Sequence, residues 1–417
     1  MKKLGLLLVG TLLLSGNAFA QKSVVDAVNK EIGGYQPNFA SAREKIKPAF
    51  TNPETKDDAR TWFVAGKTEF GAYDHLLGQL QLRQEVNKLD MANAMLDGYK
   101  YFMTALPLDS VVELNKDGSP KLDKKGNKKI KTKYSKDIVG LIVGHHNDFN
   151  VAGSYFYDAK EYGKSYEAWG IYCDLAESPL AKANKLVVAD TIVGETRFYQ
   201  AIAAWQGENF KAAIEAFAKA RAKGYVKKEA FDYAMACAAS DQNNEAIIAI
   251  AREAYPLYGK QDTQYISIMI NDFINNSKFA EATALLDEAI AANPNNAEFY
   301  DVKGSLFENQ GDADKALEFF LKSIELNPDY AKGHFDVGRY YYNKALEARK
   351  KANDLKGNEY QNAIENNVKP LYLQALPHLE KAYEKADDVA DFKNDVRHAL
   401  QNIYYFLGDE DKLNSLQ

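Results

Sequence analysis

One stretch of the chain, residues 297–330, has a 34-residue pattern that constrains the fold more than any other feature of the sequence. The preceding 34 residues, Thr263 to Asn296, carry similar residues at corresponding places, and another unit starts at Ala331. Each of the first two units ends near an Asn-Pro pair, and proline cannot continue a helix and restricts the residue before it. Periods of about 20–50 residues are typical of stacked repeats. We therefore expect a solenoid, which grows by adding units instead of enlarging one core.

The stretch from Ala297 to Tyr330 resembles one unit of the tetratricopeptide repeat, a helix–turn–helix of 34 residues. Gly304 and Ala316 occupy places where that repeat needs small side chains, because its helices cross closely there. Gly311-Asp312 stands at the turn, and bulky side chains surround the crossing: Tyr300, Phe307 and Phe320. The resemblance implies an all-α fold, a right-handed α–α superhelix of about eight helix–turn–helix repeats. We further expect a Lys-rich loop or hairpin insertion and elongated helices in some repeats.

The repeat pattern divides the chain into parts. Repeats at both ends depart from the consensus, as expected of the capping units of a solenoid. Extra residues within 57–108 and within 331–385 separate helices of one repeat, so we expect those helices to be long. The expected parts are a signal peptide, 1–20; N-terminal degenerate repeats, 21–109; the Lys-rich insertion, 110–137; central repeats, 138–262; two consensus-like repeats, 263–330; and an interrupted repeat with capping helices, 331–417.

The first 20 residues have the composition of a secretory signal peptide. Lys2 and Lys3 precede an apolar run from Leu4 to Leu14, and Ala18-Phe19-Ala20 is a small-x-small cleavage site. The run is shorter than the roughly 20 residues that span a bilayer, and no cysteine follows the site, so a lipoprotein anchor is not expected. We expect an exported protein of the periplasm, without an integral membrane segment in the mature chain. An uncleaved N-terminal anchor is the alternative.

The segment from Lys116 to Lys136 has nine lysines against Asp117 and Asp123, a local net charge of +7. Gly118 and Gly126 stand in turn signals, which favours an exposed loop or a small β-hairpin. A solvated loop without a partner is the simpler interpretation. The functional interpretation is weak contact with an acidic or phosphate-bearing surface, such as membrane lipid.

The sequence gives no pattern of an enzyme active site. It has no Gly-rich phosphate loop, nucleophile elbow or zincin helix. His145 and His146 are adjacent, whereas a zinc-binding helix places its histidines four residues apart, so a helix start is the better interpretation. Cys173 and Cys237 are expected to be two buried thiols, with a disulfide as the alternative. We expect no catalysis, cofactor or metal, and the net charge of −6 disfavours nucleic acid as a partner.

In the family that the chain resembles, the first helix of each repeat lines a concave groove that binds peptides. The second, fifth, ninth and twelfth positions of those helices face the groove. Carried onto this chain, they give the expected partner-binding residues: Asn150, Tyr157, Trp205, Asn271, Asp301, Lys332, Phe335, Arg339 and Tyr342. At the same positions, Phe198 and Ile202 together with Trp205 would make part of the groove apolar. For each residue, packing within the solenoid or simple solvation is the alternative.

The resemblance implies a non-catalytic scaffold that binds a peptide or protein in the groove. A carrier or accessory subunit that holds a glycan or lipid is the alternative, because exposed Trp and Tyr can stack on sugars and the chain has 26 Tyr. Most of these aromatic residues are expected to fill the core of the repeats. The sequence names neither the partner nor the oligomeric state.

Overall fold

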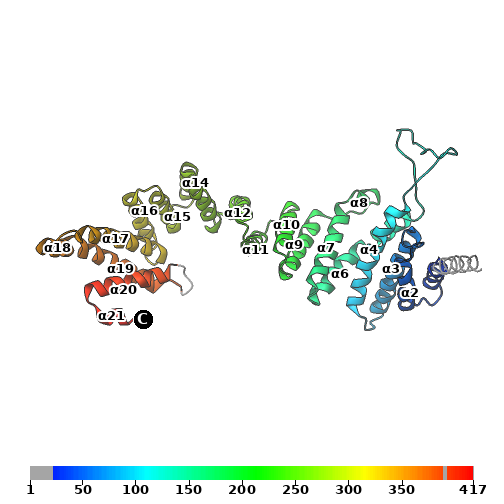
Figure 1. Cartoon of the computed structure of the whole chain (residues 1–417), viewed down its shortest axis with the longest axis horizontal. Coiled ribbons are helices and arrows are strands. Elements are labelled where there is room, and N and C mark those ends of the chain that lie inside the picture. Colours follow the sequence, from blue (N-terminus) through cyan, green and yellow to red (C-terminus); the bar gives the residue numbers. More distant parts are fainter. Residues whose placement is uncertain (1–21, 388–391, 417) are drawn as a thin grey trace, which may run out of the picture. The chain divides into compact units, whose positions relative to one another are not determined.

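The computed structural model describes residues 22–387 and 392–416, and the predicted signal peptide lies outside them. The described residues form helices and one two-stranded sheet, so the all-α prediction is confirmed (Figure 1). The chain divides into two compact units, residues 1–242 (unit 1) and 243–417 (unit 2). None of the described helices combines the length and the apolar character that a membrane span requires.

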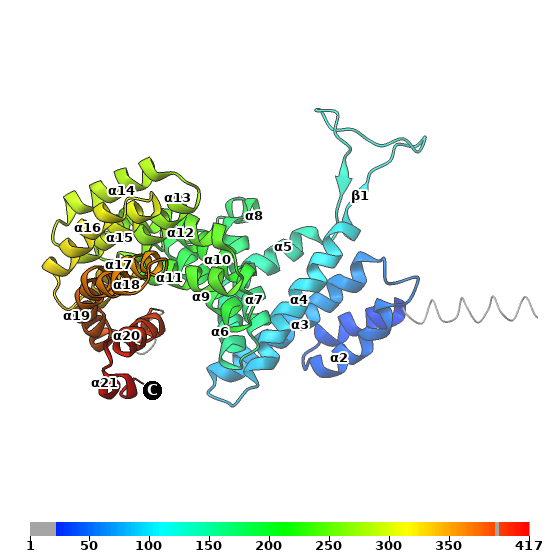
Figure 2. The ribbon, with the colours of Figure 1, turned by 60° about the vertical axis from the view of Figure 1, so that its left-hand side comes forward.

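Unit 1 is a row of helix pairs that begins with a helix over residues 22–32. Contacts run in sequence from α3 through α4, α6, α7, α9 and α10 to α11, so each helix packs mainly on its neighbours along the row (Figure 2). The elements are α2 (Phe39–Ile46), the 3-10 turn η1 (Lys47–Phe50), α3 (Ala59–Gln81), α4 (Lys88–Asp109), β1 (Val111–Val112), β2 (Ile130–Lys131), α5 (Ser135–Gly144), α6 (His146–Asp158), α7 (Tyr162–Glu177), α8 (Pro179–Ala183), α9 (Asp190–Gln206), α10 (Phe210–Ala222) and α11 (Lys228–Ser240).

Unit 2 repeats this arrangement and contains the two consensus-like repeats, α13 with α14 and α15 with α16. Its first helix is α12, so the boundary between the units falls inside the stretch 138–262 that the sequence assigns to central repeats. The elements are α12 (Asn244–Tyr258), α13 (Gln264–Asn275), α14 (Phe279–Ala292), α15 (Ala297–Asn309), α16 (Ala313–Leu326), α17 (Ala331–Ala352), α18 (Asn358–Ala363), the π-helical turn η2 (Ile364–Val368), α19 (Lys369–Lys385), α20 (Lys393–Leu407) and α21 (Glu410–Asn414).

The two helices of a pair cross closely because a glycine of one faces an aromatic ring of the other. A Cβ atom on Gly304 in α15 would lie 2.5 Å from the ring of Phe320 in α16. Gly153 in α6 and Trp169 in α7 have the same relationship, again at 2.5 Å. Both rings are buried. The predicted pairing of a small residue with a bulky one at the crossing is confirmed for Gly304.

The turn inside a pair has a residue in the left-handed backbone region. Gly311 holds this place between α15 and α16, with φ of 85°, as its position in the repeat predicts. In other pairs a residue with a side chain adopts the same conformation: Lys160, Glu208 and Ser277. After Glu208, the Asn209 N–H donates to the carbonyl of Ala204 at 2.8 Å, which ends the first helix as in a Schellman-type cap. The backbone therefore forms this turn even where the sequence has no glycine.

Some helices are longer than the family standard, as predicted. In the N-terminal part, α3 has 23 residues and α4 has 22, and residues 82–87 form the turn between them. In unit 2, α17 has 22 residues, while α18 and η2 extend the start of α19. The extra residues of these repeats therefore continue the helices and add apolar contacts between them.

The Lys-rich insertion is a β-hairpin that projects away from the helices of unit 1 (Figures 1 and 2). Its strands β1 and β2 are antiparallel, with Val111 opposite Lys131. Three segments of the hairpin also bond in a cycle: Glu113 N–H donates to Lys129 O at 2.9 Å, Lys129 N–H to Lys121 O at 2.8 Å, and Lys121 N–H to Glu113 O at 2.8 Å. These backbone bonds hold the insertion in one conformation although most of its side chains are exposed.

A single buried carboxylate holds the base of the hairpin. Asp109, the last residue of α4, accepts hydrogen bonds from the backbone N–H groups of Lys133, Tyr134 and Ser135 and from the Ser135 hydroxyl, at 2.7–3.0 Å. Ser135 is the first residue of α5 and Tyr134 is its N-cap, so their N–H groups have no partner within the helix. Burial opposes ionisation of Asp109, but the hydrogen bonds outweigh it and lower the pKa of this carboxyl. The insertion is thereby tied to the helices at both of its ends.

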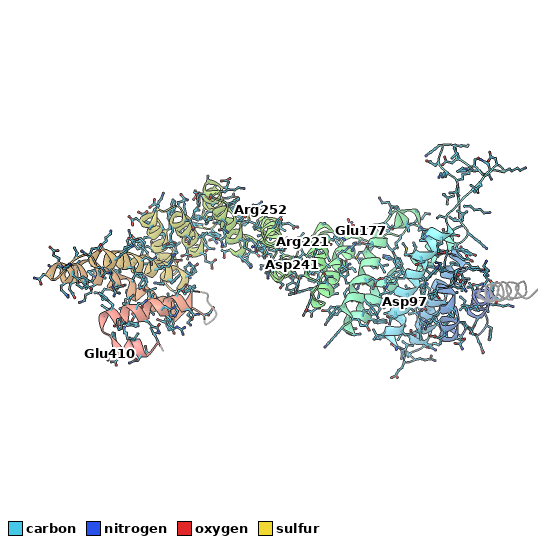
Figure 3. All side chains as sticks on the ribbon, viewed as in Figure 1. Asp97, Glu177, Arg221, Asp241, Arg252 and Glu410 are labelled. Carbon is cyan, nitrogen blue, oxygen red and sulfur yellow. The ribbon has the colours of Figure 1, made fainter. Side chains whose placement is uncertain are left out.

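Ion pairs join neighbouring helices of unit 1 where they leave the core. The Arg197 guanidinium of α9 is buried and lies 2.7 Å from the Glu177 carboxylate. Glu177 is the last residue of α7 (Figure 3). Glu177 also binds Lys223 at 3.1 Å.

Both cysteines, Cys173 and Cys237, are free and buried in this unit, as predicted, and burial raises the pKa of each thiol to about 12. Neither thiol is ionised near neutral pH.

Candidate functional site

The predicted partner-binding residues fall into two groups, one in each unit. Three belong to unit 1: Asn150 and Tyr157 on α6, and Trp205 on α9. The other six belong to unit 2: Asn271 on α13, Asp301 on α15, and Lys332, Phe335, Arg339 and Tyr342 on α17. All of them lie on first helices of their repeats, as the resemblance implies, but their environments differ.

In unit 1 a pocket of about 310 Å³ opens between α6, α7 and α9. We call it the aromatic pocket, and its lining residues are Ser154, Tyr157, Asp158, Trp169, Tyr199 and Ile202. The Trp169 ring lies 5.9 Å from the Tyr157 ring and 6.0 Å from the Tyr199 ring, centre to centre. Trp169 is only 5% exposed and forms the floor, while Tyr199 is 46% exposed and forms an outer wall.

The floor of the aromatic pocket is fixed from two sides. The indole Nε1–H of Trp169 donates to the side-chain oxygen of Asn150 at 2.9 Å and to its backbone carbonyl at 3.1 Å. Gly153, one helical turn further along α6, leaves the space that the indole ring occupies. Asn150 therefore orients Trp169, and its side-chain oxygen is already hydrogen-bonded within the chain.

Exposed aromatic side chains continue from the pocket along the first helices of unit 1. The Trp205 ring of α9 lies 5.1 Å from the ring of Tyr233 of α11, and Tyr233 is 37% exposed. We call this surface the aromatic face and define it by Tyr157, Tyr199, Trp205 and Tyr233. Tyr199 and Tyr233 of the aromatic face are exposed, whereas Tyr157 and Trp205 are half-buried.

Sequence reasoning missed Tyr199 and Tyr233. The fifth position of the family pattern pointed to Phe198, which is 7% exposed and packs on Phe217 and Tyr225. The next residue, Tyr199, faces outward instead. The available signal was chemical: a tyrosine beside a phenylalanine on one helix is the better candidate for the exposed position, because its hydroxyl is compatible with water.

In unit 2 three of the predicted residues, Asp301, Lys332 and Arg339, belong to a charged cluster between α15 and α17. Arg339 binds Glu308 through two parallel bonds of 2.9 and 2.8 Å, and Asp336 at 2.9 Å. Lys332 pairs with Asp336 and lies 3.9 Å from Asp301. Asp301 and Asp336 are 4% and 1% exposed. We call these five residues the charged cluster; most of their hydrogen-bonding capacity is satisfied within the chain.

Asp301 is the member of the charged cluster whose ionisation its surroundings oppose. Burial and the nearby Asp336 carboxylate raise the pKa of Asp301 well above its ordinary value. Its Oδ1 atom has no hydrogen-bond partner among the described residues, while the Tyr330 hydroxyl lies 3.5 Å from Oδ2. A buried carboxylate with an unsatisfied oxygen and a second carboxylate nearby is costly to ionise, so this carboxyl favours the protonated form.

Two residues predicted to face a partner lie in the interior of unit 2. Asp301 is enclosed by the charged cluster, and Phe335 is 9% exposed and stacks on Phe392 at 5.1 Å. Phe335 is buried because the residues at the start of α20 cover the face of α17 on which it lies. Tyr342 is half-buried, and its hydroxyl accepts a hydrogen bond from Asn402 of α20 at 2.9 Å. Asn271 is exposed.

The two adjacent histidines, His145 and His146, each form a hydrogen bond within the chain. His145 follows α5 and bonds Asp148 through Nδ1 at 2.9 Å. His146 is buried, and its Nε2–H donates to the Tyr172 carbonyl at 2.8 Å; burial lowers the pKa of His146. Across the part of the chain that the structure describes, no three His, Cys, Asp or Glu side chains are placed to hold a metal ion.

Comparison with known proteins identifies the class. Residues 269–331, which span most of α13 to the start of α17, match the family model described as tetratricopeptide repeat. Helix pairs with this crossing and turn geometry continue on both sides of the matched residues. The matched residues are therefore tetratricopeptide repeats, and the rest of the described chain continues the same helix-pair fold.

Individual relatives are similar over short stretches. The chain is 47% identical over 53 residues to an uncharacterised protein of Methanocaldococcus jannaschii, a match that covers 13% of this chain and 54% of that protein. It is 31% identical over 74 residues to the human protein O-mannosyl-transferase TMTC3, which covers 18% of this chain and 8% of the relative. The chain thus matches about half the length of one relative and under a tenth of the other.

Among solved structures, a TPR repeats protein from Bacteroides fragilis is similar with a TM-score of 0.31 and 16% sequence identity, over 63% of this chain and 98% of that chain.

Proposed function

We propose that the protein is a non-catalytic interaction scaffold of the periplasm that binds a peptide or protein partner along its first helices. The proposal starts from the class, since tetratricopeptide repeats present extended surfaces to partners. The observation that carries it is the aromatic face of unit 1. The few residues that dominate the energy of protein interfaces are enriched in tyrosine and tryptophan, and in this face Tyr199 and Tyr233 are exposed.

The contribution of unit 2 is a second, more polar surface. Lys332 and Arg339 are half-buried, and Asn271 is exposed with no hydrogen-bond partner among the described residues. In this proposal a partner meets Asn271 and the outer edges of Lys332, Arg339 and Tyr342. Asp301 and Phe335 then act from beneath, because they hold the α15 and α17 surfaces in place.

Export and the hairpin complete the proposal. Residues 1–20 have the composition of a cleaved signal peptide, and the exposed lysines of the hairpin would favour weak contact with an acidic surface. Intact-mass measurement of the protein from an envelope fraction tests the first part. A mass that still includes residues 1–20 would remove the signal-peptide proposal and leave the aromatic face unaffected.

Site-specific cross-linking tests the partner-binding proposal. A photo-reactive amino acid replaces Tyr199 in the aromatic face, and a matched protein carries it at Lys211, an exposed position of the second helix α10. After irradiation of intact cells, we expect one stoichiometric protein adduct from position 199 and none from position 211. Equal labelling at both positions, or labelling of many proteins in low yield, would contradict a specific partner on this face.

The same exposed rings give a second candidate function some support. Tyr199 and Tyr233 are more than a third exposed, and such rings can stack on sugars or lipid chains. In that case the protein is a carrier or accessory subunit of an envelope complex. Capture without a protein adduct, together with enrichment of a glycan or lipid that is lost on Tyr199→Ala, would favour this function over the scaffold.

A further inference from the structure

We propose that the aromatic pocket of unit 1 binds a cationic side chain, a lysine or arginine that the partner inserts between Tyr157, Trp169 and Tyr199. The inference rests on the proposed function only for the source of that side chain. The chemistry of the pocket itself is defined by residues of this chain.

The rings enclose a volume suited to a cation. Tyr157 and Tyr199 stand on either side of Trp169, each about 6 Å from it. An aromatic face carries negative electrostatic potential, and cations within about 6 Å of a ring centre are attracted to it, most strongly by tryptophan. A cation in the pocket gains this attraction from each ring whose face it lies over, since the ring edges carry the opposite potential.

No cation of the chain itself occupies this position in the described structure. Lysines do lie over neighbouring rings: Lys88 over Tyr155 at 5.2 Å and Lys164 over Phe156 at 5.4 Å. Within residues 22–387 and 392–416, no Lys or Arg is placed in this way over Tyr157, Trp169 or Tyr199. The negative potential of the aromatic pocket is therefore uncompensated, unlike that of the rings beside it.

A carboxylate at the rim strengthens the preference for positive charge. Asp158 lines the pocket, is exposed, and has no ion-pair partner among the described residues. It is the last residue of α6, where the carbonyl groups of the helix end add partial negative charge. An ammonium or guanidinium group can reach this carboxylate while its methylene groups pack on the rings.

Neutral guests fit the pocket less well. An aliphatic side chain would fill the apolar walls but would remove water from Asp158 without replacing it. A sugar needs several hydrogen-bonding groups, and the polar side chains of the lining are few. Ser154 already donates its hydroxyl hydrogen to the Asn150 carbonyl at 3.3 Å, so the two tyrosine hydroxyls and Asp158 remain. A lysine or arginine suits both the aromatic walls, through its methylene groups, and the Asp158 carboxylate, through its charge.

The three tryptophans of the chain make a direct test possible. Trp62, Trp169 and Trp205 give three indole N–H signals, which Trp→Phe variants assign in a heteronuclear NMR spectrum of the protein lacking residues 1–20. The probe is n-butylammonium chloride, an analogue of the lysine side chain, with n-butanol as the neutral control of equal length. We expect the Trp169 signal to shift in a saturable manner with n-butylammonium and little with n-butanol, while the Trp62 signal stays in place.

Two variants locate the effect. Tyr199→Leu removes an exposed ring, and Asp158→Asn removes the rim charge; we expect each to raise the Kd for n-butylammonium by roughly 3–30-fold. The matched control is Asp241→Asn, an exposed aspartate just after α11 in the same unit (Figure 3), which should leave the Kd unchanged. Equal shifts with both probes, no shift of Trp169, or unchanged Kd values in the first two variants would overturn the inference.

These outcomes separate the inference from the proposed function. A protein adduct at position 199 without n-butylammonium binding keeps the scaffold and assigns another ligand to the pocket. Saturable n-butylammonium binding without any protein adduct supports the pocket and removes the scaffold as proposed.

Discussion

The Trp169 indole nitrogen lies 2.9 Å from the side-chain oxygen of Asn150. A residue expected to meet a partner's backbone thus holds the floor of the aromatic pocket. We expect Asn150→Ala to lower the free energy of unfolding by about 0.5–1.5 kcal/mol, the typical net value of one hydrogen bond, and to move the Trp169 indole signal. Urea unfolding and NMR measure the two effects. The control is Asn147→Ala, an exposed residue of the same helix; an unmoved Trp169 signal in Asn150→Ala would contradict the assigned role.

Gly153 should tolerate no side chain. A Cβ atom there would lie 2.5 Å from the Trp169 ring, so Gly153→Ala forces the indole or the helices apart. We expect a loss of about 1–3 kcal/mol, as for other overpacked cores. Gly78→Ala in α3 is the matched control, because nothing lies within 4 Å of that position and alanine favours a helix by about 0.5–1 kcal/mol. Chemical denaturation should therefore show opposite signs for the two variants, and equal effects would contradict the close crossing.

The raised pKa of Asp301 makes unit 2 sensitive to alkaline pH. The folded protein retains a proton on this carboxyl that the unfolded chain releases above its ordinary pKa of 3.8. This group's contribution to stability is therefore complete below that pH and is lost as the pH rises through the folded pKa. An asparagine at this position cannot ionise, so we expect Asp301→Asn to gain stability relative to the natural protein as the pH rises.

Urea midpoints at pH 5 and pH 8 measure this gain. The control is Glu318→Gln on α16, which removes an exposed carboxylate outside the charged cluster. A difference for Asp301→Asn that is the same at both values would show that Asp301 is ionised throughout.

A histidine pair gives unit 2 the opposite response to acid. His334 Nε2 lies 3.0 Å from the Pro328 carbonyl and therefore carries its proton there, so His334 Nδ1 accepts from His378 Nδ1–H at 3.1 Å. Burial and the neighbouring His334 lower the pKa of His378. The unfolded chain then binds more protons, so this stability is complete above the unfolded pKa of about 6.5 and is lost as the pH falls through the folded value.

A residue that cannot bind a proton lacks this loss, so we expect His378→Asn to gain thermal stability relative to the natural protein as the pH falls from 8 to 5. His398→Asn changes an exposed histidine of α20 and serves as the control. An identical pH dependence in His378→Asn and the natural protein would show that the pair does not govern it.

The hairpin lysines should determine binding to acidic surfaces. Close to an anionic membrane each lysine contributes about 1 kcal/mol, so Lys124→Gln with Lys125→Gln should weaken binding to phosphatidylglycerol-containing vesicles roughly tenfold or more, an effect that added salt diminishes. Lys211→Gln with Lys219→Gln, on the exposed side of α10, is the charge-matched control. Vesicle co-sedimentation measures both pairs, and equal loss in the two would indicate a general effect of net charge.

Much of the repeat architecture could be predicted from the sequence because its cause is local. Gly304 and Phe320 identify the crossing, because a residue without a side chain must face the bulky ring there. Gly311 identifies the turn, because glycine readily adopts the left-handed backbone conformation. The turn at Glu208 has the same backbone geometry without such a residue, and its place followed only from the phase of the repeats.

The candidate site was predictable to the level of the helix but not of the side chain. The sequence placed Tyr157 and Trp205 on first helices, yet it selected Phe198 where Tyr199 is exposed and counted Phe335 as surface. Adjacent residues of a helix point about 100° apart, so one can be buried while the next is exposed. Packing against the neighbouring repeat determines which of the two is buried.

The sequence by itself determined the class of this protein, because a 34-residue period and the sizes of a few residues at each crossing suffice to specify paired helices. Only the tertiary structure decided which aromatic rings remain accessible, that α20 covers Phe335, and that Asp301 and Asp336 share one buried cluster. These features depend on contacts between residues of different helices, and such contacts do not produce a repeated pattern in the sequence.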